Sequence, residues 1–112
     1  MTNSRRKGCR GELELAHKLE DLLGIEARRG QQFSGGDDSP DVVHSIDGLH
    51  IECKRVEKLN IHNAVKQAID DAGDNVPVVM HRRNGQSWLV TLKLDDLPRL
   101  AEQIYLTLAK NI

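Results

Sequence analysis

The chain has 112 residues, of which 38% are hydrophobic, 29% charged and 3% aromatic, and its formal net charge is −1. This length allows one domain with one modest aliphatic core, and so few aromatic residues argue against a single-strand DNA surface built from base-stacking platforms. No apolar run could span a membrane and no secretory leader is recognisable, so we expect a cytoplasmic protein.

Residues 1–10 are strongly basic and form a tail that could be flexible, and further basic clusters are scattered along the chain. Charge alone leaves two interpretations open: an ordinary solvated surface, or a fold that gathers these clusters into one phosphate-attracting face. The residues that would form such a DNA-binding face are Arg5, Arg6, Lys7, Arg10, Arg28, Arg29, Arg55 and Lys58.

Apolar residues recur with helical spacing in three segments and with strand-like patterns in five others. In chain order we expect a helix over 11–23, a strand over 25–29, a Gly/Ser-rich loop over 31–40, a strand over 41–46, its hairpin partner over 49–56, a helix over 60–72, a hairpin of strands over 77–82 and 87–94, and a helix over 95–108. Asn60 is the expected N-cap and Gly73 the expected stop of the second helix, and Asp95 or Asp96 can cap the last one. The order α-β-β-β-α-β-β-α predicts a single α/β domain over residues 1–112.

Side chains alternate along a strand, so Glu52 and Lys54 share one face, about 7 Å apart, and Cys53 points to the other as a small buried hydrophobe. If the two strands pair through the Asp47-Gly48 turn, Glu52 and Lys54 lie toward the end that carries Asp41. Two carboxylates and one ammonium then converge. The competing interpretation is a surface strand with one Glu–Lys pair, which is common.

Such a grouping has a chemical use. Two carboxylates can hold Mg²⁺ or Mn²⁺, and a bound cation lowers the pKa of water and neutralises charge on a phosphate. A nearby lysine can orient the attacking water or stabilise the transition state.

Helical phase separates two acids near the start of the first helix. Glu12 falls on the apolar stripe of that helix, whereas Glu14 lines up with the solvated side. A carboxylate on a core-facing stripe needs a partner, and a metal site would supply one. The alternative for Glu12 is a first-turn carboxylate that is favoured by the helix dipole.

These pieces together resemble the PD-(D/E)xK nuclease superfamily, and within it the small archaeal-type Holliday-junction resolvases and their phage-encoded relatives. The resemblance covers roughly the first 70 residues. It rests on Arg6-Lys7-Gly8 leading to Glu12, the loop that ends in Pro40-Asp41, and Ile51-Glu52-Cys53-Lys54-Arg55.

The resemblance implies Asp41 and Glu52 as metal ligands, Lys54 as the catalytic lysine, and Glu12 as the acid that completes the site directly or through water. It places Ser34 near the scissile phosphate. It also implies a restriction-endonuclease-like core with a mixed central β-sheet flanked by helices, and a homodimer. Such a dimer would cut four-way or otherwise branched DNA and leave 5′-phosphate ends.

Other features leave alternatives open. Many relatives carry a site-facing polar residue at the position of Gln67, although a solvated helix glutamine is the plainer interpretation. His50 shares the strand face of Glu52, yet an exposed histidine without a catalytic role is favoured. The region after residue 74 matches no motif. A nuclease of the same fold acting on duplex, flap or nicked DNA, or a non-cleaving DNA-binding module, therefore stays possible.

Overall fold

The computed structural model describes residues 4–30 and 41–110, with side chains from residue 10 onward. Its helices are α1 (Ser4–Leu23), α2 (Ile61–Ala72) and α3 (Leu97–Ala109), and a 3-10 turn, η1 (Leu94–Asp96), precedes α3. Its strands are β1 (Ala27–Arg29), β2 (Val42–His44), β3 (Leu49–Arg55), β4 (Val76–Arg82) and β5 (Leu89–Thr91). The predicted order of elements and the α/β class are confirmed.

The strands of the described residues form two sheets. β3, β4 and β5 lie in that order in a mixed sheet, with β3 parallel to β4 and β4 antiparallel to β5. β1 and β2 form a separate antiparallel pair. The β4–β5 hairpin was expected from its Asn84-Gly85 turn, and it is confirmed.

The prediction that residues 41–46 and 49–56 pair as a hairpin is wrong. β2 pairs with β1, and β3 pairs with β4 over its whole length. β3 is covered on both faces, which suits a strand with a parallel neighbour joined through a crossover helix. β1, which follows α1, is the partner of β2. β2 and β3 therefore do not pair with each other, although the Asp47-Gly48 turn lies between them.

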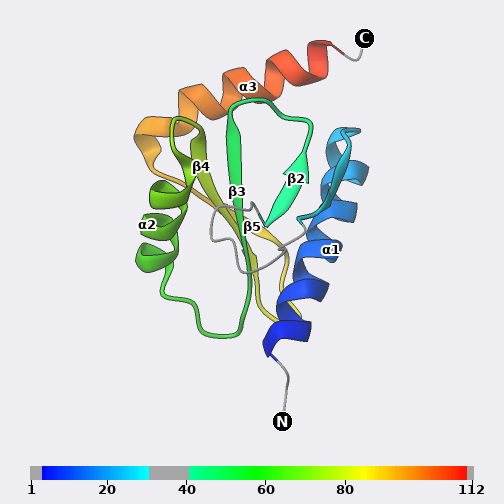
Figure 1. Cartoon of the computed structure of the whole chain (residues 1–112), viewed down its shortest axis with the longest axis vertical. Coiled ribbons are helices and arrows are strands. Elements are labelled where there is room, and N and C mark those ends of the chain that lie inside the picture. Colours follow the sequence, from blue (N-terminus) through cyan, green and yellow to red (C-terminus); the bar gives the residue numbers. More distant parts are fainter. Residues whose placement is uncertain (1–3, 31–40, 111–112) are drawn as a thin grey trace.

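Helices α1 and α2 cover opposite faces of the β3–β4 pair (Figure 1). On one face Ile51 packs with Leu15 and Ala16 of α1 in the main core cluster. On the other face Val79 packs with Ala64 and Ala68 of α2. Alternate residues of β3 and β4 are therefore directed toward different helices, and the α2 face carries Glu52 and Lys54.

Helix ends agree with the sequence in α2 and differ from it in α1. The Asn60 side chain accepts a hydrogen bond from the Asn63 backbone N at 3.1 Å, and Gly73 ends α2 with φ of 59°. Helix α1 begins at Ser4, earlier than the expected start near Gly11. Residues 4–10, which we expected as a tail, therefore form the first turns of this helix.

The expected cap of the last helix is also different. Asp96 occupies the N-cap position of α3 but has helical dihedral angles and makes no side-chain cap hydrogen bond. Because η1 leads directly into α3, the extended residue that an N-cap needs is missing at this junction. The carboxylate of Asp96 lies 3.9 Å from both Lys93 Nζ and Arg99 Nη1 instead.

Helix α3 lies across the end of the sheet where β3 begins (Figure 1). The Gln103 side chain lies against Gly48, and Lys110 Nζ is 3.4 Å from Asp47 Oδ2. Helix α3 therefore covers the end of the sheet opposite Lys54. Within the described residues, every helix is too short or too polar to cross a membrane.

Gly11 marks the closest approach of α1 to β3. A Cβ atom at Gly11 would lie only 2.5 Å from Cβ of Arg55 and 3.1 Å from its Cγ. Cβ of Arg55 is fixed by the strand backbone, so it cannot move aside as the end of a side chain could. The glycine therefore allows the helix that carries Glu12 to contact the end of the strand that carries Lys54.

We predict that Gly11→Ala lowers the free energy of unfolding by about 1–3 kcal/mol, because the overpacking outweighs the roughly 1 kcal/mol that alanine adds to helix propensity. Urea unfolding followed by circular dichroism measures the change. Lys18→Ala, at an exposed position of the same helix, is the control and should shift stability by less than about 0.5 kcal/mol. A Gly11→Ala protein as stable as the wild type would contradict the close contact.

Candidate active site

Asp41 is anchored to β3 although β2, the strand that follows it, is not paired with β3. Its Oδ2 atom accepts a hydrogen bond from the Cys53 backbone N at 2.8 Å. Its backbone oxygen accepts one from Gly30 N, also at 2.8 Å. The predicted convergence of Asp41 with Glu52 therefore occurs, through a side-chain hydrogen bond and not through a hairpin ladder.

Three carboxyl groups crowd together at this point. Burial, together with the neighbouring Glu52 and Glu12, raises the pKa of Asp41 from 3.8 to about 7, although the Cys53 N–H group favours the charged form. Burial is the largest cause, followed among the raising effects by Glu52. Asp41 and Glu12 resist ionisation, because the nearby positive charge does not offset their burial and the neighbouring carboxylates. Oxygen donors in such a set suit a hard divalent cation, and the residues therefore fit a metal site.

Glu52 is almost fully buried, with 4% of its surface exposed. Its Oε1 atom lies 3.0 Å from His50 Nε2. Burial raises the pKa of Glu52, but hydrogen bonds with His50 and Asp71 and the charges of His50 and Lys54 outweigh it, so the net shift is downward. Glu52 is therefore the more readily ionised member of the acidic group, and Asp41 keeps its proton to higher pH.

The interpretation of His50 as an exposed histidine is wrong. His50 is buried, and its hydrogen bond with Glu52 raises the pKa of its imidazole. The ligand atoms of His50, Glu52 and Asp71 all lie within 4.8 Å of one another. Strand alternation had placed His50 beside Glu52, but Asp71 carries no recognisable motif and reaches the site only because α2 packs on this face.

Lys54 and Gln67 are brought together by the packing of α2 on β3. Lys54 Nζ donates a hydrogen bond to Gln67 Oε1 at 2.9 Å. Gln67 is exposed, as the plainer interpretation required, but its amide oxygen faces the lysine. The contact restrains the ammonium group on the same strand face as Glu52.

Glu12 and Glu14 differ as helical phase predicted, with one addition. Glu12 is half-buried, lies 3.6 Å from Arg29 Nε, and has its pKa raised by burial and by Glu52 in spite of Arg29. Glu14 is not simply solvated: its Oε1 atom accepts a hydrogen bond from Trp88 Nε1 at 3.0 Å and lies 3.1 Å from Arg82 Nε. Glu12 faces the acidic group, and Glu14 ties α1 to the β4–β5 hairpin.

Cys53 packs against the main core, as strand alternation predicted. Burial, with Asp41 and Glu12 nearby, raises the pKa of its thiol, which therefore stays protonated and unreactive.

The other expected residues are only partly described. Ser34 and Pro40, and the side chains of Arg5, Arg6 and Lys7, lie outside the described residues. Of the remaining basic residues, Arg55 is half-buried, and the exposed ones are Arg10, Arg28, Arg29 and Lys58.

We predict that Asp41→Asn stabilises the metal-free protein at pH 8 by an amount on the order of 2 kcal/mol. A carboxyl whose pKa is raised on folding contributes stability at low pH that is lost as pH rises from 3.8 toward 7. The stability difference between variant and wild type should therefore grow across this window and level off above it. Urea unfolding in EDTA at pH 4.5, 6 and 8 measures it.

Added Mg²⁺ should reverse this order by stabilising the wild type and not the Asp41→Asn protein, because a ligand that binds only the folded state raises its stability. Asp21→Asn, on the exposed side of α1, is the matched control and should keep the response to Mg²⁺. A pH-independent effect of Asp41→Asn would contradict the crowding of carboxylates.

The hydrogen bond between His50 and Glu52 can be tested by substitution. His50→Leu should destabilise the protein by about 1–3 kcal/mol, because the buried Glu52 carboxylate loses a hydrogen-bond partner. In a double-mutant cycle with Glu52→Gln, we expect a coupling energy of at least about 0.5 kcal/mol. Additive effects would mean that the 3.0 Å contact does not support Glu52.

Comparison with known proteins identifies a family. A family model described as phage putative PDDEXK endonuclease matches residues 3–111, which is nearly the whole chain. No curated protein and no solved structure matches the chain. The match extends through β4, β5 and α3, the part of the sequence in which we recognised no motif. The chain, with its acidic group and adjacent lysine at the end of β3, belongs to the phage PDDEXK endonuclease family.

Proposed function

We propose that this chain is a divalent-metal-dependent endodeoxyribonuclease that hydrolyses phosphodiester bonds in branched DNA, as a homodimeric enzyme resembling Holliday-junction resolvases. The observation that carries the proposal is the crowding of Asp41, Glu52 and Glu12 beside Lys54, with the pKa of Asp41 raised to about 7. Burying these acids beside one another does not stabilise the fold. We therefore attribute their arrangement to a cation that they bind.

Asp41 and Glu52 would hold Mg²⁺ or Mn²⁺, with Glu12 completing the site directly or through water. A cation bound there lowers the pKa of water and neutralises charge that builds on the phosphate. The chain prepares its ligands for this role. The Cys53 N–H group orients the Asp41 carboxyl, and the His50 imidazole orients Glu52.

Lys54 is the proposed catalytic lysine, and Gln67 positions it. The 2.9 Å hydrogen bond to Gln67 limits the rotation of a long side chain, which keeps the ammonium near the carboxylates at little further entropic cost. The positive charge can then stabilise the transition state at the scissile phosphate or orient the attacking water. Attack of water on phosphorus, with the P–O3′ bond breaking and O3′ taking up a proton, would leave a 5′-phosphate and a 3′-hydroxyl.

DNA would approach the end of the sheet at which β3 finishes. Basic residues from three parts of the chain are proposed to contact its phosphates: Arg5, Arg6, Lys7 and Arg10, then Arg28 and Arg29, then Arg55 and Lys58. Ser34 is proposed to lie near the scissile phosphate. A homodimer would supply the two sites that paired incision of a junction needs, and its DNA substrate makes the cytoplasm the expected compartment.

Two other functions compete with this proposal. The same chemistry could act on duplex, flap or nicked DNA, because the acidic group and lysine say nothing of branch geometry. A non-cleaving DNA-binding module is less well supported, since it would have no use for crowded acids with a raised pKa.

We predict that the protein with Mg²⁺ or Mn²⁺ makes paired cuts in a labelled four-way junction in preference to duplex, flap and single-stranded DNA. Lys54→Ala should lower the cleavage rate about 100-fold or more, because a charge that stabilises the transition state is lost. Lys66→Ala, an exposed lysine of α2, is the matched control and should cleave like the wild type. Single-turnover cleavage followed on gels measures these rates.

Equal cleavage of all forms would reduce the function to general endonuclease activity. DNA binding without any incision, unchanged by Lys54→Ala, would reject the enzyme. A strictly monomeric protein on DNA, measured by light scattering, would contradict paired cutting.

A further inference from the structure

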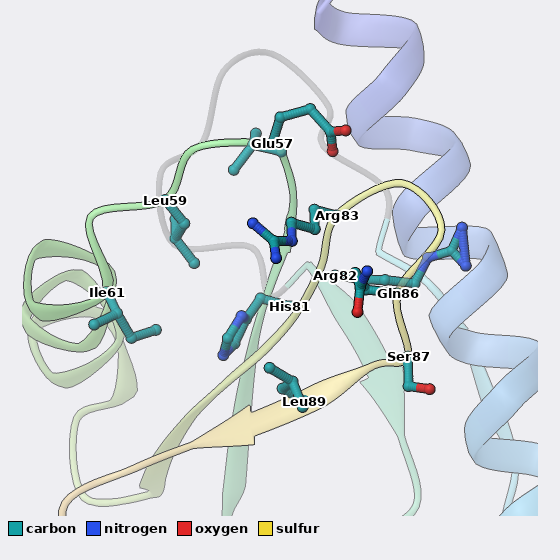
Figure 2. A pocket seen from close by; sticks show the side chains of 10 residues that line it. Glu57, Leu59, Ile61, His81, Arg82, Arg83, Gln86, Ser87 and Leu89 are labelled. Carbon is teal, nitrogen blue, oxygen red and sulfur yellow. The ribbon is translucent and has the colours of Figure 1, made fainter.

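A cavity of about 370 Å³ opens at the end of the sheet where β3 and β4 finish (Figure 2). Its walls come from the segment after β3, the start of α2, and the β4–β5 hairpin. The residues that line it are Val56, Glu57, Leu59, Ile61, His81, Arg82, Arg83, Gln86, Ser87 and Leu89. None of these residues was assigned a role in the proposed chemistry.

Apolar and polar side chains both line the cavity. Leu59, Ile61 and Leu89 project toward its centre, with the His81 ring between them (Figure 2). Burial lowers the pKa of His81, so its imidazole is neutral near pH 7, and its Nε2 atom lies 2.8 Å from Thr91 Oγ1. Leu89 nevertheless has 56% of its surface exposed, so an apolar wall faces solvent.

Most charged groups at the rim are already engaged within the fold. Arg82 Nε lies 3.1 Å from Glu14 Oε1, and Glu57 Oε2 accepts a hydrogen bond from Asn84 N at 2.7 Å. Arg83 is exposed, and its guanidinium points into the space between Leu59 and His81 (Figure 2). The cavity therefore combines apolar side chains with the positive charge of Arg83, which suits a flat ring attached to a phosphate.

The register of the sheet places this cavity beside the proposed catalytic lysine. His81 lies directly opposite Lys54 in the parallel β3–β4 pair, so both side chains are on the α2 face. Neighbouring strands are about 4.8 Å apart. A phosphate at Lys54 would therefore have its adjoining nucleotide within reach of the cavity. The carboxyl ends of parallel strands are also where open α/β sheets bind their ligands.

We propose that the cavity binds the base of one unpaired DNA nucleotide next to the scissile phosphate, with Arg83 contacting the adjoining phosphate. The inference rests on the proposed nuclease function and names its substrate class: DNA with an unstacked nucleotide at the cut, as at a branch point. Apolar side chains and guanidinium planes can hold a base that has left the stack. The volume lies at the lower end of small-ligand sites and suits one base.

The experiment compares Leu89→Trp, which fills the cavity, with Val90→Trp. Val90 is the matched control: it is the next residue of β5, 52% of its surface is exposed, and it points to the opposite face. Leu89→Ala, which removes the apolar wall without adding bulk, is the second variant. The substrates are nicked duplexes that do or do not have one unpaired nucleotide beside the phosphate that the enzyme cleaves. Where present, the unpaired nucleotide carries 2-aminopurine.

For the wild type, we expect faster cleavage of the DNA with the unpaired nucleotide. Leu89→Trp should lower this preference about 10-fold or more, which is the effect of losing one bound base, and Val90→Trp should retain it. In a Lys54→Ala background cleavage is slow enough for binding to be measured first. Binding should then change the 2-aminopurine emission when the cavity is free, and should not change it in the Leu89→Trp protein. Leu89→Ala should weaken both effects.

Two results would overturn the inference while leaving the nuclease intact. One is cleavage and emission that are the same for Leu89→Trp and Val90→Trp. The other is a dimer of the wild type that becomes a monomer only with Leu89→Trp, because the cavity would then accept a second copy of the chain. Failure of the wild type to cut any DNA would instead reject the proposed function, and it would be visible before any cavity variant is compared.

Discussion

The hydrogen bond from the Cys53 backbone N to Asp41 Oδ2 holds the candidate site together. β2 belongs to one sheet and β3 to another, and this 2.8 Å bond joins them at the end where the acids meet. It fixes the Asp41 carboxyl beside Glu52 without strand pairing between the two segments. Two consecutive residues of β3 thus contribute to the site. The backbone N–H of Cys53 orients the Asp41 carboxyl, and the side chain of Glu52 is the second acid.

The burial of these carboxyl groups close to one another lowers the stability of the fold whenever they are ionised. Asp41 and Glu12 both have raised pKa values, with burial as the first cause, while Glu52 stays ionised because His50 and Asp71 hydrogen-bond with it. Local hydrogen bonds therefore stabilise the charge of Glu52, whereas the positive charge near Asp41 and Glu12 does not offset their burial. In a chain with so modest a core, this electrostatic cost is a large share of a small net stability.

Local sequence determined much of the fold and the centre of the site. Asn60 and Gly73 were predictable because caps depend on neighbouring residues, and Glu52, Cys53 and Lys54 because strand alternation fixes which side chains share a face. The prediction of a β2–β3 hairpin was wrong because strands compete for partners: β1 pairs with β2, and β4 pairs with β3. Long-range pairing of this kind leaves little trace in a short apolar run.

Contacts between distant segments account for what the sequence could not show. The local sequence predicted an exposed His50, because its burial depends on the packing of the distant helix α2. Asp71 approaches Glu52 through the same packing. Trp88 binds Glu14 across 74 positions of the chain, and no spacing rule relates such residues. The family match reaches this second half of the chain, yet it too names no residue there.

The second half of the chain explains why two acids near the start of α1 have different surroundings. Glu14 contacts Trp88 and Arg82, so its carboxylate fastens the helix to the β4–β5 hairpin. With the helix fixed there, and with Gly11 against Arg55, Glu12 is held toward Asp41 and Glu52. The same hairpin forms one wall of the cavity beside Lys54. Packing that orients the acidic group therefore also shapes the cavity beside Lys54.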